Sequence, residues 1–219
     1  MGIEIDLLEQ YPKSKRDVTG RGSEKTEIDR EIARKFGKEF FDGDRKNGYG
    51  GFNYDPKFWS PVVPIFQKHF SLDSKSSVLD VGCAKGFMIY DLSRLIPGIT
   101  VKGIDISEYA VENALTEVKE NVKVADAKDL PFDDNSFDVV ISINTVHNLE
   151  INECGKALQE IERVSRGKSF ITVDAYRNEE EKERMFAWNL TGRTIMSTQD
   201  WIIFFDKVGY TGDYFWFIP

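Results

Sequence analysis

The chain has little cysteine, no long apolar run and no surplus of basic residues. Each of these absences argues against a class of protein. Its two cysteines, Cys83 and Cys154, have a spacing that suits neither a disulfide framework nor a metal site, so we expect a cytoplasmic protein without a bound metal. No stretch approaches the roughly 18 apolar residues of a membrane-spanning helix, and no membrane partner is expected. The net charge of −8, with lysines and arginines interspersed among acids, argues against a nucleic-acid partner.

The composition is that of a globular enzyme of modest size. A chain of 219 residues that is 41% hydrophobic can bury one good core, which favours a single α/β domain with an appendage. No internal repeat or low-complexity tract is visible. We expect a small-molecule substrate and either a monomer or a homodimer.

The most informative segment runs from Val78 to Phe87, with the sequence Val-Leu-Asp-Val-Gly-Cys-Ala-Lys-Gly-Phe. It predicts a buried strand ending near Asp80, a turn, and a helix that continues to Leu95. Gly82 and Gly86 allow the backbone of the turn to pass close to a ligand that a Cβ atom would block. Units of this kind bind dinucleotides, phosphates or S-adenosylmethionine, and the segment alone does not decide among them.

Three further apolar segments follow, and each leads into polar residues. The segments 100–106, 122–125 and 137–143 are predicted strands, and the first contains Asp105 near its end. A βαβ unit places a carboxylate in this position against the hydroxyl groups of a ribose, so Asp105 is a candidate ribose ligand.

Taken in order, the four segments resemble the motifs of the class I S-adenosylmethionine-dependent methyltransferases, in particular the small-molecule, type 11-like ones. The resemblance covers roughly residues 75–175 and implies an α/β fold, with a Rossmann-like, doubly wound sheet of six or seven mostly parallel strands. A nucleotide-dependent dehydrogenase would instead carry Gly-x-Gly-x-x-Gly. Ala84 replaces the middle glycine that is usual in the methyltransferases, and we expect altered local packing rather than loss of cofactor binding.

The resemblance also implies the cofactor contacts. The turn after the first strand would hold the methionine part of S-adenosylmethionine, with Asp80 near its amino group, while Asp126 would accept a hydrogen bond from the adenine amine. Ile106 would flank the adenine ring, and Ile143 would offer its backbone carbonyl. The predicted cofactor-binding residues are Asp80, Gly82, Cys83, Gly86, Asp105, Ile106, Asp126, Ala127 and Ile143.

The region before the first motif predicts a helical cap over residues 1–70, leaving 71–219 as the Rossmann-like methyltransferase domain. Apolar residues recur at helical spacing over 26–41 and again over 57–70. The loop 42–55 between them is rich in glycine and aromatic residues and is longer than a simple connector. It is either a gate over cofactor and substrate or a flexible hinge whose aromatics pack on the core. The residues proposed here for substrate binding are Tyr49, Tyr54 and Trp59.

The C-terminal part predicts a fifth strand over 169–173, helices over 178–189 and 197–207, and one final strand over 214–218. The family usually closes its sheet with two strands in an antiparallel hairpin. Because this chain has residues for only one such strand, the sequence does not decide how the edge of the sheet is closed. Further substrate-binding candidates lie along this part and on the loop after the fourth strand: Asn144, Tyr176, Arg177, Trp188, Asn189 and Arg193.

His147 and Asp174 are the candidate catalytic residues. His147 follows the fourth strand, where carboxyl ends of strands meet substrate, and its ordinary pKa suits it to accept a proton from a hydroxyl. It could equally serve only to order its loop. Asn144 stands where a metal-dependent enzyme would want a carboxylate. We therefore expect metal-independent methyl transfer to a small molecule, more readily at oxygen than at nitrogen or carbon. The alternatives are a catalytically silent S-adenosylmethionine-binding regulator and a nucleotide-dependent oxidoreductase.

Overall fold

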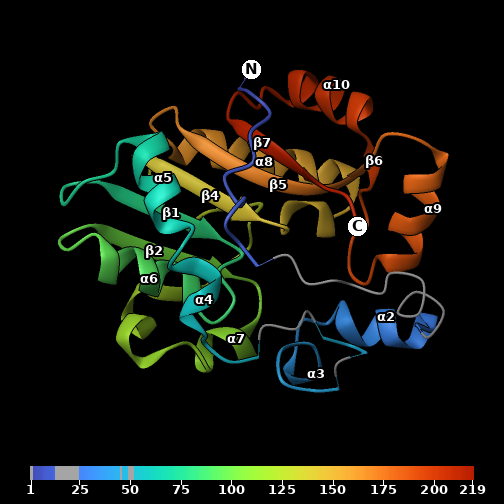
Figure 1. The fold of residues 1–219 in the computed structure, drawn as a ribbon, viewed down its shortest axis with the longest axis horizontal. Coiled ribbons are helices and arrows are strands. Elements are labelled where there is room, and N and C mark those ends of the chain that lie inside the picture. The colour runs from blue at the N-terminus through green and yellow to red at the C-terminus, as the bar shows by residue number, and fades with distance from the viewer. Residues whose placement is uncertain (1, 13–24, 45, 49–51) are drawn as a thin grey trace.

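A parallel sheet of seven strands forms the centre of the computed structural model, which describes residues 2–12, 25–44, 46–48 and 52–219 (Figure 1). Its strands, in spatial order, are β3 (Val122–Val124), β2 (Thr100–Asp105), β1 (Ser77–Val81), β4 (Val139–Ile143), β5 (Ser169–Tyr176) and β6 (Met196–Ser197), and β7 (Asp213–Phe217) also pairs with β5. Every one of these pairs is parallel. The doubly wound, Rossmann-like fold predicted from the sequence is therefore confirmed.

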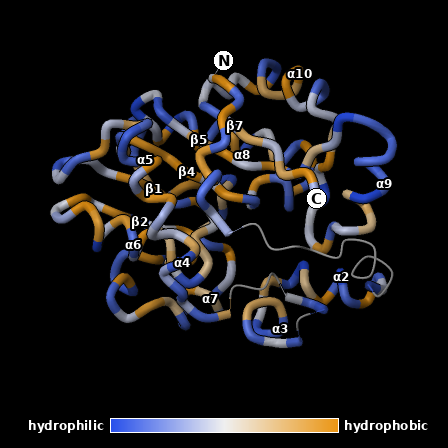
Figure 2. Tube along the Cα trace, in the orientation of Figure 1, coloured by the Kyte–Doolittle hydropathy of each residue, from blue (hydrophilic) through white to orange (hydrophobic). Residues whose placement is uncertain are grey.

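Successive strand residues point to opposite sides of the sheet, so the apolar strands present side chains on both faces. Helices cover both of these faces. Val78 of β1 packs with Phe66 in one core cluster, whereas Leu79 packs with Phe205 in the other. The first face is covered by α5 (Val63–Phe70) and α6 (Phe87–Leu95), and the second by α8 (Ile151–Val164) and α10 (Thr198–Val208). The hydropathy colouring in Figure 2 follows this arrangement, with apolar residues along the central strands. Further helical elements are α4 (Pro56–Trp59), α7 (Glu108–Glu112), α9 (Glu179–Trp188) and the 3-10 turns η1 (Thr116–Asn121) and η2 (Val146–Asn148).

The two long helices predicted before the first strand are both interrupted. The helix expected over 26–41 is divided into α2 (Glu27–Ala33) and α3 (Lys38–Phe41), because Phe36 between them has a left-handed φ of 48°. The helix expected over 57–70 is divided into α4 and α5, and Pro64 lies in the first turn of α5. Proline lacks an N–H group, so it begins a helix more readily than it continues one.

The C-terminal edge of the sheet also differs from expectation. β5 extends to Tyr176, so that Asp174 lies within the strand rather than after it. The last strand, β7, runs parallel to β5, and the N-terminal segment covers its other side. The backbone N–H of Ile5 donates to the carbonyl of Tyr214 over 2.9 Å, and the N–H of Tyr214 donates to the carbonyl of Ile3 over 3.1 Å. This pairing covers part of an edge that would otherwise be exposed.

The helices α2 and α3 form a small cap beyond the carboxyl ends of the strands, beside α9 (Figure 1). Ser107, which precedes α7, fixes this cap by donating its hydroxyl hydrogen bond to the carbonyl of Phe36 over 2.5 Å. Within the described residues, no helix has both the length and the apolar character needed to cross a membrane.

Candidate functional site

The turn between β1 and α6 is held against the neighbouring strands by backbone contacts that only glycine permits. Gly82 has a φ of 86°, and its N–H donates to the carbonyl of Ile104 over 2.8 Å. A Cβ atom at Gly82 would lie 2.1 Å from the hydroxyl oxygen of Thr145, in the loop after β4. Gly86, with a φ of 78°, is the N-cap of α6. The turn therefore brings its backbone, and the first amides of α6, to the carboxyl edge of the sheet.

Ala84 stands in this turn in a left-handed conformation, with a φ of 49°. Its N–H donates to a carboxylate oxygen of Asp105 over 2.8 Å, so the middle position of the motif keeps a defined backbone contact despite its side chain. The alanine therefore adopts a conformation that L-residues with a side chain disfavour.

Replacing Ala84 by glycine is therefore expected to cost no stability. The substitution relieves about 1–2 kcal/mol of left-handed strain, but glycine gives back roughly 0.5–1 kcal/mol through the entropy of the unfolded chain. We expect a free energy of unfolding that is unchanged or up to about 1.5 kcal/mol higher. Urea denaturation measures it, and a clear loss of stability would show that the alanine methyl makes a packing contact worth more than the strain.

Asp105 links the turn to the beginning of α7. One of its carboxylate oxygens accepts from Ala84, and the other accepts from the N–H of Ser107 over 2.9 Å. Burial raises the pKa of Asp105, and these two N–H donors oppose the rise. Each oxygen retains a second lone pair, so the carboxylate can also accept from ribose hydroxyls.

Asp80 is a buried carboxylate with no hydrogen-bond donor within the part of the chain that the structure describes. Its exposed fraction is 4%. Burial, and then the nearby charge of Asp105, raise the pKa of Asp80 well above its ordinary value. A carboxylate in this state is stabilised by a cation that also donates hydrogen bonds, which is what the ammonium group of S-adenosylmethionine provides. The residues present thus fit the cofactor that the motif implies.

The residues predicted for the adenine and ribose lie at the ends of adjacent strands. Asp105 at the end of β2 pairs with Val124 of β3, shortly before Asp126. Ile106 is 54% exposed, which is unusual for isoleucine and leaves an apolar surface free to flank a ring. Asp126 also accepts from the N–H of Lys128, and the carbonyl of Ile143 accepts from the Thr145 hydroxyl.

Cys83 and Ala127 are buried neighbours of these groups. Burial raises the pKa of the Cys83 thiol well above its ordinary value, with the charges of Asp80 and Asp105 as further causes. Cys83 is therefore a neutral packing residue, and its contribution to a cofactor site comes from the backbone.

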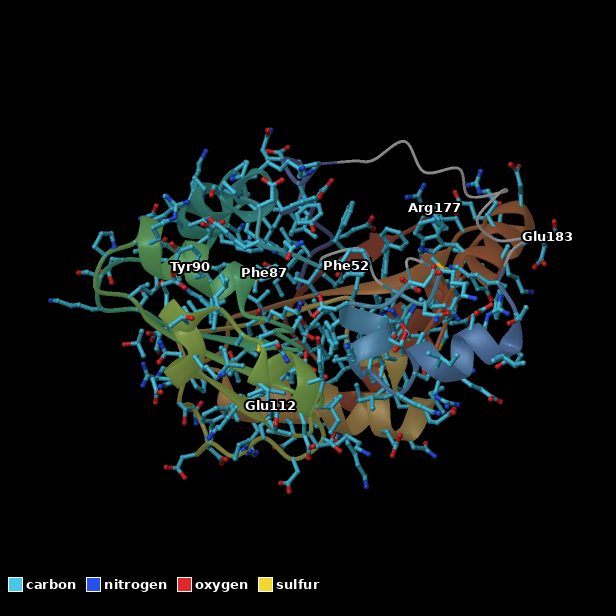
Figure 3. The ribbon with its side chains drawn as sticks, turned by 90° about the horizontal axis from the view of Figure 1, so that it is seen from below. Phe52, Phe87, Tyr90, Glu112, Arg177 and Glu183 are labelled. Carbon is cyan, nitrogen blue, oxygen red and sulfur yellow. The ribbon has the colours of Figure 1, made fainter. Side chains whose placement is uncertain are left out.

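Lys85 is a buried residue of the turn, and the motif alone predicts no role for it. With 6% exposure, it pairs its ammonium group with Asp42 over 2.5 Å and donates to the carbonyl of Phe52 over 3.0 Å. Tyr109 of α7 donates to the other oxygen of Asp42. Figure 3 shows Phe52 between Phe87 of α6 and the helices of the cap. The signal in the sequence was a lysine inside a turn that closes on the core, where its charge needs a partner.

His147 and Asp174 are brought together at the carboxyl edge. The imidazole is 3% exposed, its Nε2 lies 3.5 Å from a carboxylate oxygen of Asp174, and its Nδ1 lies 3.4 Å from the Asp174 N–H. Burial lowers the pKa of His147, and the charge of Asp174 opposes this shift, so the ring is neutral near pH 7. The backbone carbonyl of His147 also accepts from the N–H groups of Arg193 and Thr194. The pair is in place, and its role as a base stays a prediction.

The remaining substrate candidates divide into two groups. Asn189 and Arg193 lie beside the His147 turn, and Asn144 lies at the end of β4, where its side-chain oxygen accepts from Thr172. The ammonium group of Lys25 lies over the ring of Trp188, at the end of α9, in a cation–π contact.

The others are held in contacts away from this turn. Tyr54 donates to Asp91 over 2.7 Å and contacts the rings of Phe87 and Tyr90, while Trp59 packs against Tyr11. Tyr176 lies under the ammonium group of Lys182, and Arg177, near α9 in Figure 3, pairs with Glu181. Tyr49 and part of the predicted gate loop 42–55 lie outside the described residues.

Comparison with known proteins gives this site a family. Residues 79–173 match the family model described as a methyltransferase domain. Among curated proteins, a mitochondrial arginine hydroxylase of Mus musculus is 34% identical over 39% of this chain and 24% of its own length. A tRNA (carboxymethyluridine(34)-5-O)-methyltransferase of Arabidopsis thaliana is 32% identical over 56% of this chain and 29% of its own. The chain thus spans about a quarter of these relatives.

Among solved structures, the crystal structure of MccD protein superimposes with a TM-score of 0.52 at 26% identity, covering 71% of this chain and 72% of the other. The matched residues contain the turn with Asp80 and the strand end with Asp105, and they extend to Val173 of β5. The motif order, the parallel sheet and the buried carboxylate at its edge agree with these similarities. Residues 79–173 thus form a methyltransferase domain of the class I S-adenosylmethionine-dependent kind.

Proposed function

We propose that this chain transfers the methyl group of S-adenosylmethionine to a small-molecule acceptor, at a hydroxyl oxygen and without a metal. The observation that carries the cofactor part is the buried carboxylate of Asp80, which has no donor of its own in the described structure. An open pocket of about 390 Å³ beside the His147 turn supports a small acceptor, because it would hold a metabolite or part of one.

When bound, S-adenosylmethionine supplies an activated methyl group, so that catalysis consists mainly of positioning the nucleophile in line with it. The chain's task on the cofactor side is to bind and orient. Asp80 would pair with the ammonium group, the backbone of the turn from Gly82 to Gly86 would hold the methionine part, and Asp105 would accept from the ribose. Lys85 would support the turn from behind through its ion pair with Asp42.

On the acceptor side, the new bond joins the hydroxyl oxygen to the methyl carbon, and the bond from that carbon to sulfur breaks. The hydroxyl proton must then go to a base. We assign it to the neutral imidazole of His147, with Asp174 stabilising the imidazolium that forms. The ring lies 3.5 Å from the Asp174 carboxylate and 3.4 Å from the Asp174 backbone nitrogen, and these contacts are long enough for it to adjust when an acceptor binds.

A second candidate function is a cofactor-binding protein without methyl transfer. The observation that favours it is that both ring nitrogens of His147 are turned towards Asp174, which leaves neither for an acceptor in this arrangement. Moreover, one relative of the matched region is named as a hydroxylase. Formation of S-adenosylhomocysteine on a panel of hydroxyl, amine and carbon acceptors separates the two candidates.

Asp80→Asn tests the cofactor assignment. Loss of one charged hydrogen bond, worth about 1.5–3 kcal/mol, should weaken S-adenosylhomocysteine binding at neutral pH about tenfold or more. In the wild type, affinity should fall as the pH drops through the raised pKa of Asp80, because binding an ammonium group then requires the carboxyl to lose its proton. The asparagine variant should lose this pH dependence.

Isothermal titration across a pH series measures both effects. The matched control is Asp133→Asn, which removes an exposed carboxylate from the loop before β4. A folded Asp80→Asn protein with wild-type affinity and an unchanged pH profile would refute the assignment of the ammonium group to Asp80.

A further inference from the structure

We infer that the acceptor carries an anionic group, a carboxylate or a phosphate, which the arginines of the open pocket bind. This inference rests on the proposed function, since it names the substrate class of the same site. The pocket has a volume of about 390 Å³, and its polar lining consists mainly of Arg30, Arg34, Arg193, Glu27, Glu150 and Asn189.

The pocket lies between the cap and the segment that follows α9. Figure 1 shows α2 beside α9, and Figure 3 shows the same neighbourhood from below. Hydrogen bonds join the walls: Lys25 donates to the carbonyl of Trp188, and the Nε of Arg30 donates to the carbonyl of Asn189 over 3.4 Å. The arginines therefore reach the pocket from both walls, on elements that the fold brings together.

The charges in the pocket favour an anion. Three arginines face two glutamates, which gives a local charge of +1 in a chain whose net charge is −8. Each glutamate is already paired: Glu27 with Arg34 over 2.8 Å, and Glu150 with Arg193 over 2.9 Å. Glu27 also lies 3.8 Å from a guanidinium nitrogen of Arg30. The glutamates thus hold all three guanidinium groups in place, and a positively charged ligand would find no unpaired carboxylate among these residues.

Arg34 gives the second and more specific observation. Its side chain is 22% exposed, yet its Nε is buried and has no hydrogen-bond partner within the described residues. A buried N–H without an acceptor costs free energy, and a guanidinium group offers five donors in a planar fork that fits carboxylate and phosphate. If the guanidinium group turns towards the pocket, an anionic ligand group there would supply the missing acceptor.

The pocket also adjoins the residues assigned to chemistry. The N–H of Arg193 donates to the carbonyl of His147 over 3.0 Å, and a Cβ atom on Gly192 would lie 3.1 Å from the His147 ring. An acceptor anchored by its charged end in this pocket would therefore lie beside the His147 turn. The cap then selects the acceptor, while the strand ends hold the cofactor.

Inorganic phosphate and malonate serve as probes for the two possible anionic groups. The full chain is titrated with each at constant ionic strength, with and without saturating S-adenosylhomocysteine. We expect at least one probe to bind, and Arg34→Gln to weaken its binding about tenfold or more. Arg34→Lys, which keeps the charge but loses the fork, should give an intermediate loss. Preference for phosphate or for malonate identifies the group.

Arg184→Gln is the matched control, because Arg184 is likewise an arginine paired with a glutamate, but it does not line the pocket. It should bind the probes as the wild type does, and melting temperatures check that each variant is folded. Absence of binding by both probes, or equal binding by the Arg34→Gln and control proteins, would overturn the inference. Failure of S-adenosylhomocysteine to bind would instead overturn the proposed function, so the two failures are distinguishable.

Discussion

Gly82→Ala is expected to destabilise the protein by about 3 kcal/mol or more, the largest stability effect among the substitutions considered. Two causes combine. The φ of 86° is a conformation that costs an alanine about 1–2 kcal/mol, and the new Cβ would lie 2.1 Å from the hydroxyl oxygen of Thr145 and 2.7 Å from its Cβ. The loop after β4 must therefore move away from the turn, and cofactor binding should be lost with it.

The chain offers a control that separates the two causes. Gly167 has a φ of 95°, but a Cβ there would meet no atom within 4 Å, so Gly167→Ala should cost only the conformational part, about 1–2 kcal/mol. Urea denaturation gives both free energies of unfolding. Thr145→Ala in the Gly82→Ala background should restore part of the loss, because it removes the two nearest atoms. Equal losses in the two glycine variants would contradict the steric account.

His147→Ala is expected to reduce turnover about a hundredfold while leaving the affinity for S-adenosylhomocysteine nearly unchanged. The reason is that the imidazole is assigned to the acceptor, not to the cofactor. Removing a buried ring beside Asp174 should also lower the melting temperature. Single-turnover rate, cofactor affinity and melting temperature are measured on the same preparation, with an acceptor found in the panel.

His69→Ala provides the matched control, since His69, the other histidine, pairs with Asp213 over 2.7 Å and does not belong to the site. It should lower the melting temperature and leave turnover unchanged. If His147→Ala likewise loses stability but keeps wild-type turnover, His147 serves to order its loop. The proton would then go to Asp174 or directly to solvent.

The parts of the fold that the sequence predicts well are those decided within a few residues. The apolar run at Val78, the acid at position 80 and the glycines that follow define strand, turn and helix by local sterics and periodicity. Asp105 follows because a parallel βαβ unit returns the next strand to the same edge. Local rules are therefore enough to predict where these strands end, and the strand ends carry the residues assigned to the cofactor.

The parts that could not be predicted depend on contacts between distant segments. Periodicity alone gives no sign that Phe36 would break a helix, since its left-handed conformation becomes tolerable only when Ser107 bonds to its carbonyl. The pairing of Lys85 with Asp42, and the meeting of Arg34 with Asn189 in one pocket, depend likewise on where the cap rests. Hence the strand ends that carry the residues assigned to the cofactor could be predicted from the sequence, whereas the contacts around the residues assigned to the acceptor could not.

The pairing of Ile3 and Ile5 with Tyr214 has a consequence for how the chain folds. The N–H of Ile3 bonds to the side chain of Asp213, 210 positions away, and β7 reaches its place only by pairing with β5. Contacts so distant along the chain form late, because closing a long loop costs entropy before any contact repays it. During synthesis, the outer edge of β5 therefore stays uncovered until β7 has emerged from the ribosome. We expect this edge to be the region most prone to aggregation in the growing chain, and its closure to be the slow step of refolding.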